Sequence, residues 1–262
     1  MGEAGGVLNV RAPAKLTVSL RVTGVRADGY HELDAEMVTL SLADELVIDE
    51  GGRGLVVEAD PSTRAAALPP LDDNLIGRAL AACGRSAAVR LRKRIPLGAG
   101  LGGGSADAAA ILRWAGATDP ALAAGLGADV PFCVVGGRAR VGGVGERVTA
   151  LDFVRRDYLL LLPPFGCDTA AVYRAWDAQP GHDGPNELAA AALVTEPRLA
   201  LWRDALGDLA GRPPRLAGSG STWFVEGGPA EAGTEDAPEL RHKEETARLV
   251  RVHTVPAGWE GD

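Results

Sequence analysis

The most informative stretch of the sequence is Pro96-Leu97-Gly98-Ala99-Gly100-Leu101-Gly102-Gly103-Gly104-Ser105-Ala106-Asp107. Five of the seven residues from Gly98 to Gly104 are glycine. Because glycine has no Cβ atom, such a loop can bring several backbone N–H groups close to one anion. A helix predicted from Ser105 to Trp114 would point its positive end at the same anion. The stretch therefore predicts a phosphate-binding loop that leads directly into a helix.

Two familiar phosphate motifs fit this loop poorly. Gly98, Gly100 and Gly103 have the spacing of the dinucleotide-binding fingerprint, but Pro96 precedes the loop and no repeated strand–helix–strand pattern follows. No Lys-Ser or Lys-Thr follows the last glycine, which excludes a Walker loop. A glycine-rich turn for close helix packing remains an alternative. Ser105 is either a ligand of a phosphate or metal or simply the N-cap of the helix.

Around the loop, hydrophobic periodicity and turn residues predict a mixture of strands and helices. Strands are predicted at residues 7–10, 16–22, 36–42, 45–48, 55–58, 87–92, 130–135, 138–141, 158–162, 221–226 and 249–254. Helices are predicted at residues 75–82, 105–114, 119–126, 170–178, 187–193 and 198–209. Pro13 is expected to interrupt the first run, and Asp28-Gly29 to form a turn. The acidic segment 227–245 is expected to form a solvated loop and a surface helix.

Composition and charge exclude several classes of protein. Lys and Arg number 27 against 35 Asp and Glu, and the net charge of -8 disfavours a nucleic-acid partner. No apolar run approaches the roughly 18 to 20 residues that a membrane span needs. The three cysteines form no CxxC pair, which argues against a zinc site or a disulfide framework. With no signal-peptide pattern at the N-terminus, we expect a cytoplasmic protein without nucleic-acid or membrane partners.

Lys15 and Asp129 are the two candidates for acid–base or electrostatic chemistry. Only three of the 27 basic residues are lysine, and Lys15 follows Pro13 between two predicted strands. A compact ammonium there could polarise a hydroxyl group, although a surface lysine at a bend is an ordinary alternative. Asp129 lies at the entry of an apolar segment, where partial burial and a nearby cation would tune a carboxylate to accept a proton. For Asp129, an N-cap or turn role is left equally open.

Five motifs, read together, carry a resemblance to a known family. They are Pro13-Ala14-Lys15, Asp28-Gly29-Tyr30-His31-Glu32-Leu33, residues 96–107, residues 127–132 and Gly218-Ser219-Gly220-Ser221. In order and approximate spacing they resemble the GHMP kinases, and the resemblance covers nearly the whole chain. It implies an α+β two-domain fold, with a ribosomal protein S5 domain 2-like N-terminal domain at residues 1–156 and a ferredoxin-like C-terminal domain at residues 157–262. The active site would lie between the two domains.

The resemblance also implies roles for the residues that match the family motifs. Asp129 would be the base for the substrate hydroxyl, and Lys15 would orient that hydroxyl and stabilise developing charge. ATP would contact Asn74, Pro96, Leu97, Gly98, Ala99, Gly100, Leu101, Gly102, Gly103, Gly104, Ser105 and Ala106. The substrate would contact Thr17, Tyr30, His31 and Thr169. Mg²⁺ is expected as a second cofactor, with Ser105 as its candidate ligand.

The implied substrate carries a cytosine, on which Tyr30 would stack while His31 forms hydrogen bonds to the edge of the base. It is cytidine-diphospho methylerythritol, phosphorylated at its 2-hydroxyl in the non-mevalonate route to isoprenoids. Two alternatives stay open: a kinase of another small alcohol, of the homoserine or mevalonate type, and a catalytically silent homologue that binds nucleotide. A monomer or a weak homodimer is expected. The chain departs from the family pattern with Thr17 in place of Asn, Ala106 in place of Ser and Glu187 in place of Asp.

Overall fold

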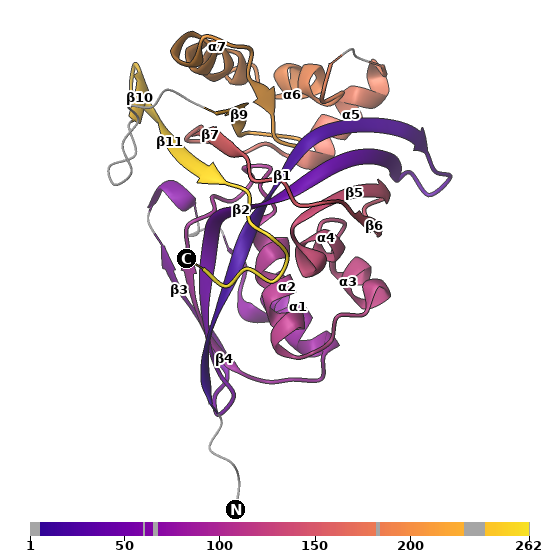
Figure 1. Ribbon diagram of the computed structural model, residues 1–262, viewed down its shortest axis with the longest axis vertical. Coiled ribbons are helices and arrows are strands. Elements are labelled where there is room, and N and C mark those ends of the chain that lie inside the picture. Colours follow the sequence, from indigo (N-terminus) through magenta and orange to yellow (C-terminus); the bar gives the residue numbers. More distant parts are fainter. Residues whose placement is uncertain (1–5, 60, 65–67, 182–183, 228–238, 262) are drawn as a thin grey trace, which may run out of the picture.

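The computed structural model describes residues 6–59, 61–64, 68–181, 184–227 and 239–261. Two long antiparallel strands, β1 (Val7–Val25) and β2 (His31–Asp49), run through the molecule (Figure 1). The predicted turn at Asp28-Gly29 connects them, and Gly29 there adopts a φ of 85°, which favours glycine. The ribbon belongs to the first sheet, and apolar side chains near its turn pack against the helices that cover the second sheet.

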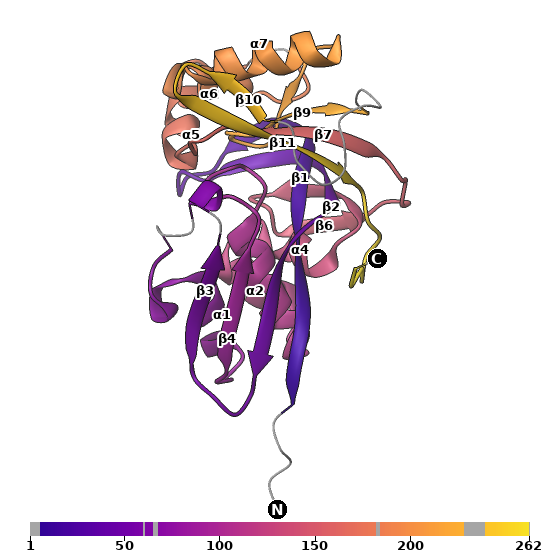
Figure 2. The ribbon, with the colours of Figure 1, turned by 90° about the vertical axis from the view of Figure 1, so that its left-hand side faces the viewer.

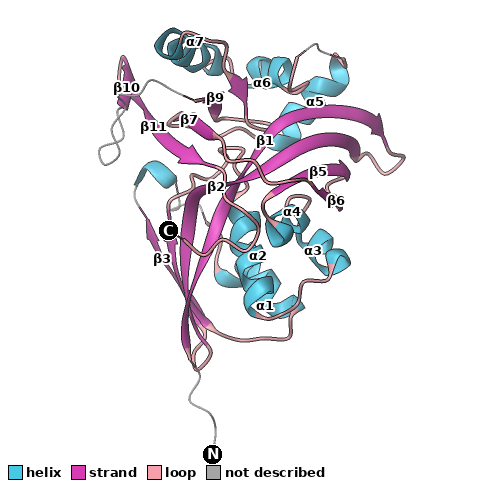
Figure 3. Ribbon diagram, in the orientation of Figure 1, coloured by secondary structure: helices cyan, strands magenta, loops and turns pink. Residues whose placement is uncertain are grey.

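The first sheet is built on β2. Its other strands are β3 (Gly54–Ala59), β4 (Ala88–Lys93), β5 (Arg138–Gly143) and β6 (Arg147–Ala150). They have the order β3-β4-β2-β5-β6, with β1 paired to the other edge of β2. Figure 3 shows the strands in magenta and the helices grouped beside this sheet in cyan. The helices packed against this sheet are α1 (Leu75–Ala82), α2 (Gly103–Trp114), α3 (Pro120–Leu126) and α4 (Val130–Val135). The alanine-rich α2 is buried from Ala106 to Leu112, because small side chains let it lie close to its neighbours.

The second sheet is antiparallel throughout. Its strands are β7 (Asp157–Leu162), β8 (Arg215–Leu216), β9 (Trp223–Glu226), β10 (Glu239–His242) and β11 (Glu245–His253). They have the order β10-β11-β7-β9-β8. The helices that cover it are α5 (Thr169–Ala178), α6 (Ala189–Thr195) and α7 (Leu199–Ala210) (Figure 2).

Buried apolar side chains hold the two halves together. One cluster fills the space between the first sheet and its helices, and another lies under α5, α6 and α7. A third cluster joins the two sheets and includes Leu16, Leu40, Ile95, Tyr158 and Phe224. Burial of apolar surface stabilises the folded state by about 25 cal/mol per Å². Because the third cluster contains residues of both sheets, this stabilisation holds the two halves of the molecule together.

Two predicted interruptions are wrong. β1 is continuous through Pro13, and the strands predicted at residues 36–42 and 45–48 are parts of the single strand β2. Among the described strands, β1 pairs with β2 alone, and beyond them it makes one isolated bridge, from Leu20 to Asn186. Pro13 therefore lies on an edge strand, where a proline is tolerated. The register shifts directly after Pro13, so the proline bends the strand without ending it.

Two further predictions are also wrong. Residues 130–135 form the short helix α4 instead of a strand, and Pro131 lies in its first turn, where a missing N–H costs no hydrogen bond. No surface helix follows residue 238, because β10 and β11 form a hairpin there; the loop predicted at residues 228–238 lies outside the described residues.

The domain boundary near residue 156 stays a prediction. Within the described ranges, no helix has the length and apolar character needed to cross a bilayer.

Candidate active site

A bulge in β1 changes the face on which the side chains after Thr17 lie. In a regular strand alternate residues share a face, which would place Lys15, Thr17, Ser19 and Arg21 together. The register of β1 against β2 shifts between Thr17 and Ser19, however. As a result Lys15 and Thr17 line a large cleft, whereas Ser19 and Arg21 line a separate pocket.

The large cleft has a volume of about 770 Å³ and lies where the glycine loop, the ribbon and α5 meet. It brings together most of the predicted site residues, although they come from distant parts of the sequence. Those that line it are Lys15, Thr17, Tyr30, His31, Pro96, Leu97, Gly98, Ala99, Gly100, Gly102, Gly103, Gly104, Ser105, Asp129 and Thr169. Segments on both sides of residue 156 therefore contribute to one cleft.

Lys15 and Asp129 form an ion pair in this cleft. Lys15 Nζ lies 3.3 Å from Asp129 Oδ2 and donates a hydrogen bond of 3.1 Å to Thr17 Oγ1. The Lys15 side chain is 6% exposed and that of Asp129 is 32% exposed, so the ammonium is held in place while the carboxylate remains accessible. Asp129 is the N-cap residue of α4, but its side chain makes no capping hydrogen bond. Its carboxylate is thus available for chemistry.

The glycine loop makes approaches that other residues would block. Gly98, Gly100 and Gly102 have φ values of 66°, 77° and 66°. A Cβ atom at Gly100 would collide with the carbonyl oxygen of Ala217, and one at Gly102 would lie 2.8 Å from Lys15 Cγ. α2 begins directly after Gly102, so its N-terminal N–H groups open onto the cleft. The loop thus combines close packing with the geometry of an anion site.

The Gly218-Ser219 turn lines the cleft from the second half of the molecule. The buried Asn186 side chain donates hydrogen bonds to the carbonyl oxygens of Leu216 at 2.9 Å and Gly218 at 2.7 Å. The hydroxyl groups of Thr169 and Ser219 lie 2.8 Å apart, which ties the start of α5 to this turn. The N–H groups of Ser221 and Thr222, which follow the turn, donate hydrogen bonds of 3.3 and 3.1 Å to the carbonyl oxygens of Gly98 and Ala99 and so hold it beside the glycine loop.

Two of the departures from the family pattern make local contacts. Thr17 accepts the hydrogen bond from Lys15 described above. Glu187 Oε2 accepts a hydrogen bond of 2.9 Å from the backbone N–H of Val22, so this side chain reaches β1 from the loop before α6. Both residues therefore support the ribbon that carries Lys15.

Three predicted ATP contacts lie outside the wall of the cleft. Asn74 caps α1, with its Oδ1 accepting hydrogen bonds from the N–H groups of Ile76 at 2.8 Å and Gly77 at 3.1 Å. The side chains of Leu101 and Ala106 are buried in the hydrophobic clusters. The third departure, Ala106, therefore removes no group from the cleft wall, and the roles of these three residues toward a nucleotide stay predictions.

A second lysine–carboxylate cluster lies beneath the glycine loop, and the sequence analysis did not identify it. Lys93 Nζ lies 2.5 Å from Asp44 Oδ2 and 2.7 Å from Asp107 Oδ2, and all three side chains are buried. A Cβ atom at Gly103 would lie 3.0 Å from Lys93 Nζ, which places the cluster against the first turn of α2. Asp107 therefore forms a buried ion pair, in addition to its expected place near the positive end of the helix.

Burial controls the protonation of this buried cluster. Burial is the main cause of the rise in the pKa of Asp107 to about 7. The Lys93 ammonium opposes this rise, and the Asp44 carboxylate adds to it. Burial alone would lower the pKa of Lys93, but the two carboxylates hold it above its usual value. One oxygen of Asp107, Oδ1, has no hydrogen-bond partner within the described ranges. The lysine is thus charged and shared by two carboxylates.

Tyr30 and His31 also line the cleft, and His31 lies beside α5. Tyr30 is 64% exposed, which leaves its ring free to stack on a ligand. The His31 ring centroid lies 4.6 Å from that of Tyr173, and His31 Nε2 lies 2.6 Å from Asp177 Oδ1. Burial raises the pKa of Tyr173, so its hydroxyl keeps its proton.

The contribution of α5 to the cleft was not predicted from the sequence. Tyr173, Arg174 and Asp177 all line it, but only Thr169 had been identified in this segment. Tyr173 and Asp177 are four residues apart and therefore lie on one face of the helix. That spacing was the available signal, but nothing in the sequence indicates that this face meets His31.

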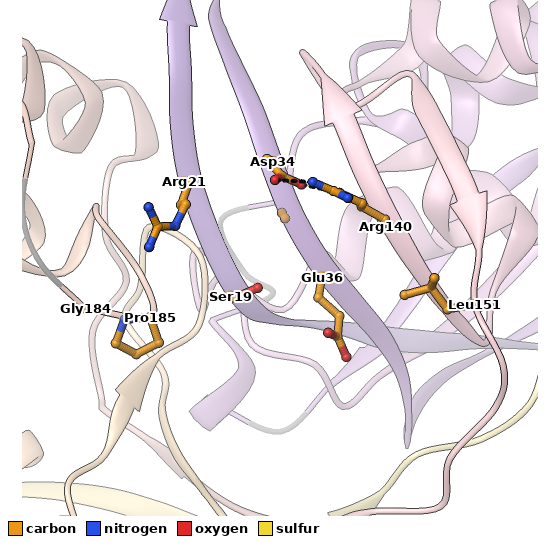
Figure 4. Close-up of a pocket in the computed structure, with 9 residues that line it drawn as sticks. Ser19, Arg21, Asp34, Glu36, Arg140, Leu151, Gly184 and Pro185 are labelled. Atoms are coloured by element: carbon orange, nitrogen blue, oxygen red, sulfur yellow. Dashed lines mark hydrogen bonds and ion pairs between the residues drawn. The ribbon is translucent and has the colours of Figure 1, made fainter.

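A smaller pocket of about 470 Å³ lies on the other face of the β1–β2 ribbon (Figure 4). Asp34 accepts two hydrogen bonds of 2.6 Å from Arg140, and this pairing is the main cause that lowers the pKa of Asp34. Glu36 accepts a hydrogen bond of 2.8 Å from Arg138. Both carboxylates of the pocket are thus paired with arginine, whereas Asp129 in the large cleft is paired with Lys15.

Comparison with known proteins identifies the class to which this geometry belongs. Residues 74–137 match the family model for the GHMP kinases N terminal domain. The 4-diphosphocytidyl-2-C-methyl-D-erythritol kinase of Paracoccus denitrificans is 38% identical, over 81% of this chain and 84% of that protein. The protein of the same name from Methylibium petroleiphilum is 34% identical, over 97% of this chain and 92% of its own length.

A solved structure agrees with these relatives. A crystal structure of 4-(cytidine 5'-diphospho)-2C-methyl-D-erythritol kinase is 36% identical and has a TM-score of 0.68, covering 86% of this chain and 90% of that one. The chain belongs to the GHMP kinase family. It is an ATP-dependent small-molecule kinase, and the α+β fold predicted from its sequence is confirmed.

Proposed function

We propose that this chain transfers the γ-phosphoryl group of ATP to the 2-hydroxyl of 4-diphosphocytidyl-2-C-methyl-D-erythritol, in the non-mevalonate route to isoprenoids. The observation that carries the proposal is the Lys15–Asp129 pair, with 3.3 Å between Nζ and Oδ2, in the same cleft as the glycine loop. The relatives named above, at 34% and 38% identity, support the choice of substrate.

The accessible carboxylate of Asp129 is suited to accept the proton of the attacking hydroxyl. Phosphoryl transfer depends mainly on positioning and on stabilising charge, so no covalent intermediate on the protein is required. An ammonium group has three N–H donors. Lys15 directs one of them to Thr17 and lies close to Asp129, which leaves donor capacity for the substrate oxygen. Lys15 would thus orient the hydroxyl and offset the negative charge that develops on it.

The glycine loop is suited to hold the phosphate groups of ATP. The N–H groups of the first turn of α2 and the positive φ values of the loop give a cradle for anionic oxygens. Mg²⁺ commonly retains several waters and uses few protein ligands beside the substrate phosphates. This fits the cleft, where Ser105 offers one oxygen, and where the described residues contain no cluster of three His, Cys, Asp or Glu side chains. When bound, the ion would neutralise charge on the β- and γ-phosphates.

The aromatic end of the cleft is suited to a nucleobase. Tyr30 is exposed enough to stack on one, and His31 and Tyr173, which are in contact with each other, line the same cleft. Homoserine and mevalonate carry no base, so these side chains would have no partner in a kinase of those alcohols. These side chains therefore favour the cytidine-bearing substrate.

The test is to incubate the purified protein with ATP and Mg²⁺ and to follow ADP release. We expect turnover with 4-diphosphocytidyl-2-C-methyl-D-erythritol and none above background with homoserine or mevalonate. Turnover with either of the other alcohols would contradict the assigned substrate. ATP binding by calorimetry without turnover of any alcohol would instead support a catalytically silent nucleotide-binding homologue.

A further inference from the structure

His31 is held from one side by a single face of α5. The centroid of its imidazole ring lies 4.6 Å from that of Tyr173 and 5.6 Å from that of Trp176, whose ring is nearly perpendicular to it. Asp177 Oδ1 lies 2.6 Å from His31 Nε2. Positions 173, 176 and 177 share one face of a helix, so α5 presents all three side chains to the histidine together. The His31 side chain is only 11% exposed and has little freedom to turn.

The contact with Asp177 determines which ring nitrogen carries the proton. An ionised carboxylate only accepts hydrogen bonds, so Nε2 must be the donor in this pair. In a neutral imidazole the other nitrogen, Nδ1, then carries a lone pair and acts as an acceptor. Within the described ranges, no protein group forms a hydrogen bond with Nδ1, and His31 lines the cleft. The protein thus presents a hydrogen-bond acceptor to a ligand at this end.

We propose that Asp177 is a positioning residue that makes His31 an acceptor toward the nucleobase, so that the site selects a pyrimidine with an exocyclic amino group. Cytosine has a 4-amino donor, whereas uracil has a carbonyl oxygen at the same position. Against uracil, the Nδ1 lone pair would face a second acceptor and both would lose their hydrogen bonds with water. This inference rests on the proposed function, because it requires a base in the cleft.

The kinetic test compares the cytidine substrate with its uridine-diphospho analogue. We expect the wild-type protein to favour the cytidine substrate by about 100-fold or more in kcat/KM, because a site built around one hydrogen bond rejects analogues that cannot make it. In Asp177→Ala we expect this ratio to fall about tenfold, through a higher KM for the cytidine substrate with kcat nearly unchanged. The value of kcat/KM for the uridine analogue should stay constant or rise.

Asp168→Ala is the matched control on the same helix. Asp168 caps α5 by accepting a hydrogen bond of 3.2 Å from the N–H of Ala171, and it does not line the cleft. Its removal loosens α5 without touching the histidine, so the preference for cytidine should persist. If Asp177→Ala and Asp168→Ala lower kcat/KM equally for both nucleotides, Asp177 is merely structural and the inference is wrong. If the wild type phosphorylates neither substrate, the proposed function itself fails.

A spectroscopic measurement tests the same point without turnover. The chain has four histidines, so ¹⁵N-histidine labelling with His31→Gln as the assignment variant isolates the His31 ring. At alkaline pH we expect the wild-type spectrum to show a protonated Nε2 and an unprotonated Nδ1, and Asp177→Ala to show a mixture of tautomers. A ring protonated on Nδ1 in the wild type, alone or on both nitrogens, would overturn the inference.

Discussion

Two lysine–carboxylate clusters flank the glycine loop, and they differ in burial. Lys15 and Asp129 lie 3.3 Å apart in the cleft, with about a third of the carboxylate side chain exposed. Lys93 is shared by Asp44 and Asp107 at 2.5 and 2.7 Å, and none of these side chains is more than 3% exposed. The same residue types thus form one cluster that a ligand can reach and one cluster that is enclosed by the protein.

The difference shows that residue type does not fix the role of an ion pair. A buried charge that loses its partner is costly, so the Lys93 cluster is suited to hold β2, β4 and α2 in register beneath the loop. Asp44 adds to this by accepting hydrogen bonds from the backbone N–H groups of Arg94 and Ile95. A partly exposed carboxylate can exchange its partner for a substrate hydroxyl, so the Lys15 pair is suited to chemistry.

The largest expected effect on activity is that of Lys15→Met. Loss of one preorganised donor near developing charge typically lowers kcat by about 10² to 10³. We expect a loss of this size in steady-state kinetics, with the thermal unfolding midpoint close to that of the wild type. A variant that unfolds several degrees earlier would show that Lys15 is also structural, which would weaken the comparison.

The matching change in the buried cluster is Lys93→Met, and here the expected effect is on stability. Removing one partner of a buried ion pair typically costs about 3 to 5 kcal/mol, because the remaining charges have no counterion. Urea unfolding should therefore show a clearly lower midpoint. An unchanged midpoint together with a loss of activity like that of Lys15→Met would mean that Lys93 acts on the ligand.

A smaller effect is expected for Thr17→Val, which keeps the shape of the side chain but removes the acceptor of the Lys15 hydrogen bond. A hydrogen bond to a charged group is worth about 1.5 to 3 kcal/mol, so kcat/KM should fall about tenfold or more. Thr17→Asn, which restores the residue usual in the family, should lose less. Equal losses in both variants would show that the hydroxyl itself does not position Lys15.

The last expected effect is a change in how the free energy of unfolding depends on pH. In the folded protein the pKa of Asp107 is raised to about 7, chiefly by burial, whereas an unfolded Asp titrates near 4. Between about pH 4 and 7 the folded state therefore binds more protons, and this group makes the free energy of unfolding fall as pH rises. In urea unfolding at several pH values, we expect the free energy of unfolding of Asp107→Asn to lack this fall. The control is Asp204→Asn, at an exposed position of α7, whose free energy of unfolding should depend on pH as that of the wild type does. Parallel curves for wild type and Asp107→Asn would contradict the raised pKa.

The sequence predicted those features that depend on local periodicity or on motifs. The helix at residues 75–82 occurs where it was expected, and Asn74 caps its start. The helix predicted from Ser105 to Trp114 ends as expected but begins earlier, at Gly103, so Ser105 is not its N-cap. The six residues of α4 were predicted as a strand, because a short apolar run has no period that separates the two structures. Pro131 was the available signal, since proline is common in the first turn of a helix.

The features that depend on tertiary contacts could not be predicted in the same way. Lys15 and Asp129 were identified one by one, but the distance between them follows from how α4 packs beside β1. The Lys93 cluster depends on the pairing of β2 with β4, and the Asp177–His31 pair joins residues 146 positions apart. Neither leaves a pattern in the local sequence. The interruption predicted at Pro13 was wrong for the same reason, because only the strand pairing shows that Pro13 lies on an edge strand.

The measurement that bears most directly on the exposed pair is the single-turnover rate of phosphoryl transfer in Asp129→Asn. With enzyme in excess over 4-diphosphocytidyl-2-C-methyl-D-erythritol and saturating ATP, we expect the wild type to convert the substrate rapidly. The variant should bind both ligands but transfer the phosphoryl group about 10² to 10⁴ times more slowly, because it lacks the general base. Transfer at the wild-type rate in Asp129→Asn would contradict the assignment of the exposed pair to catalysis.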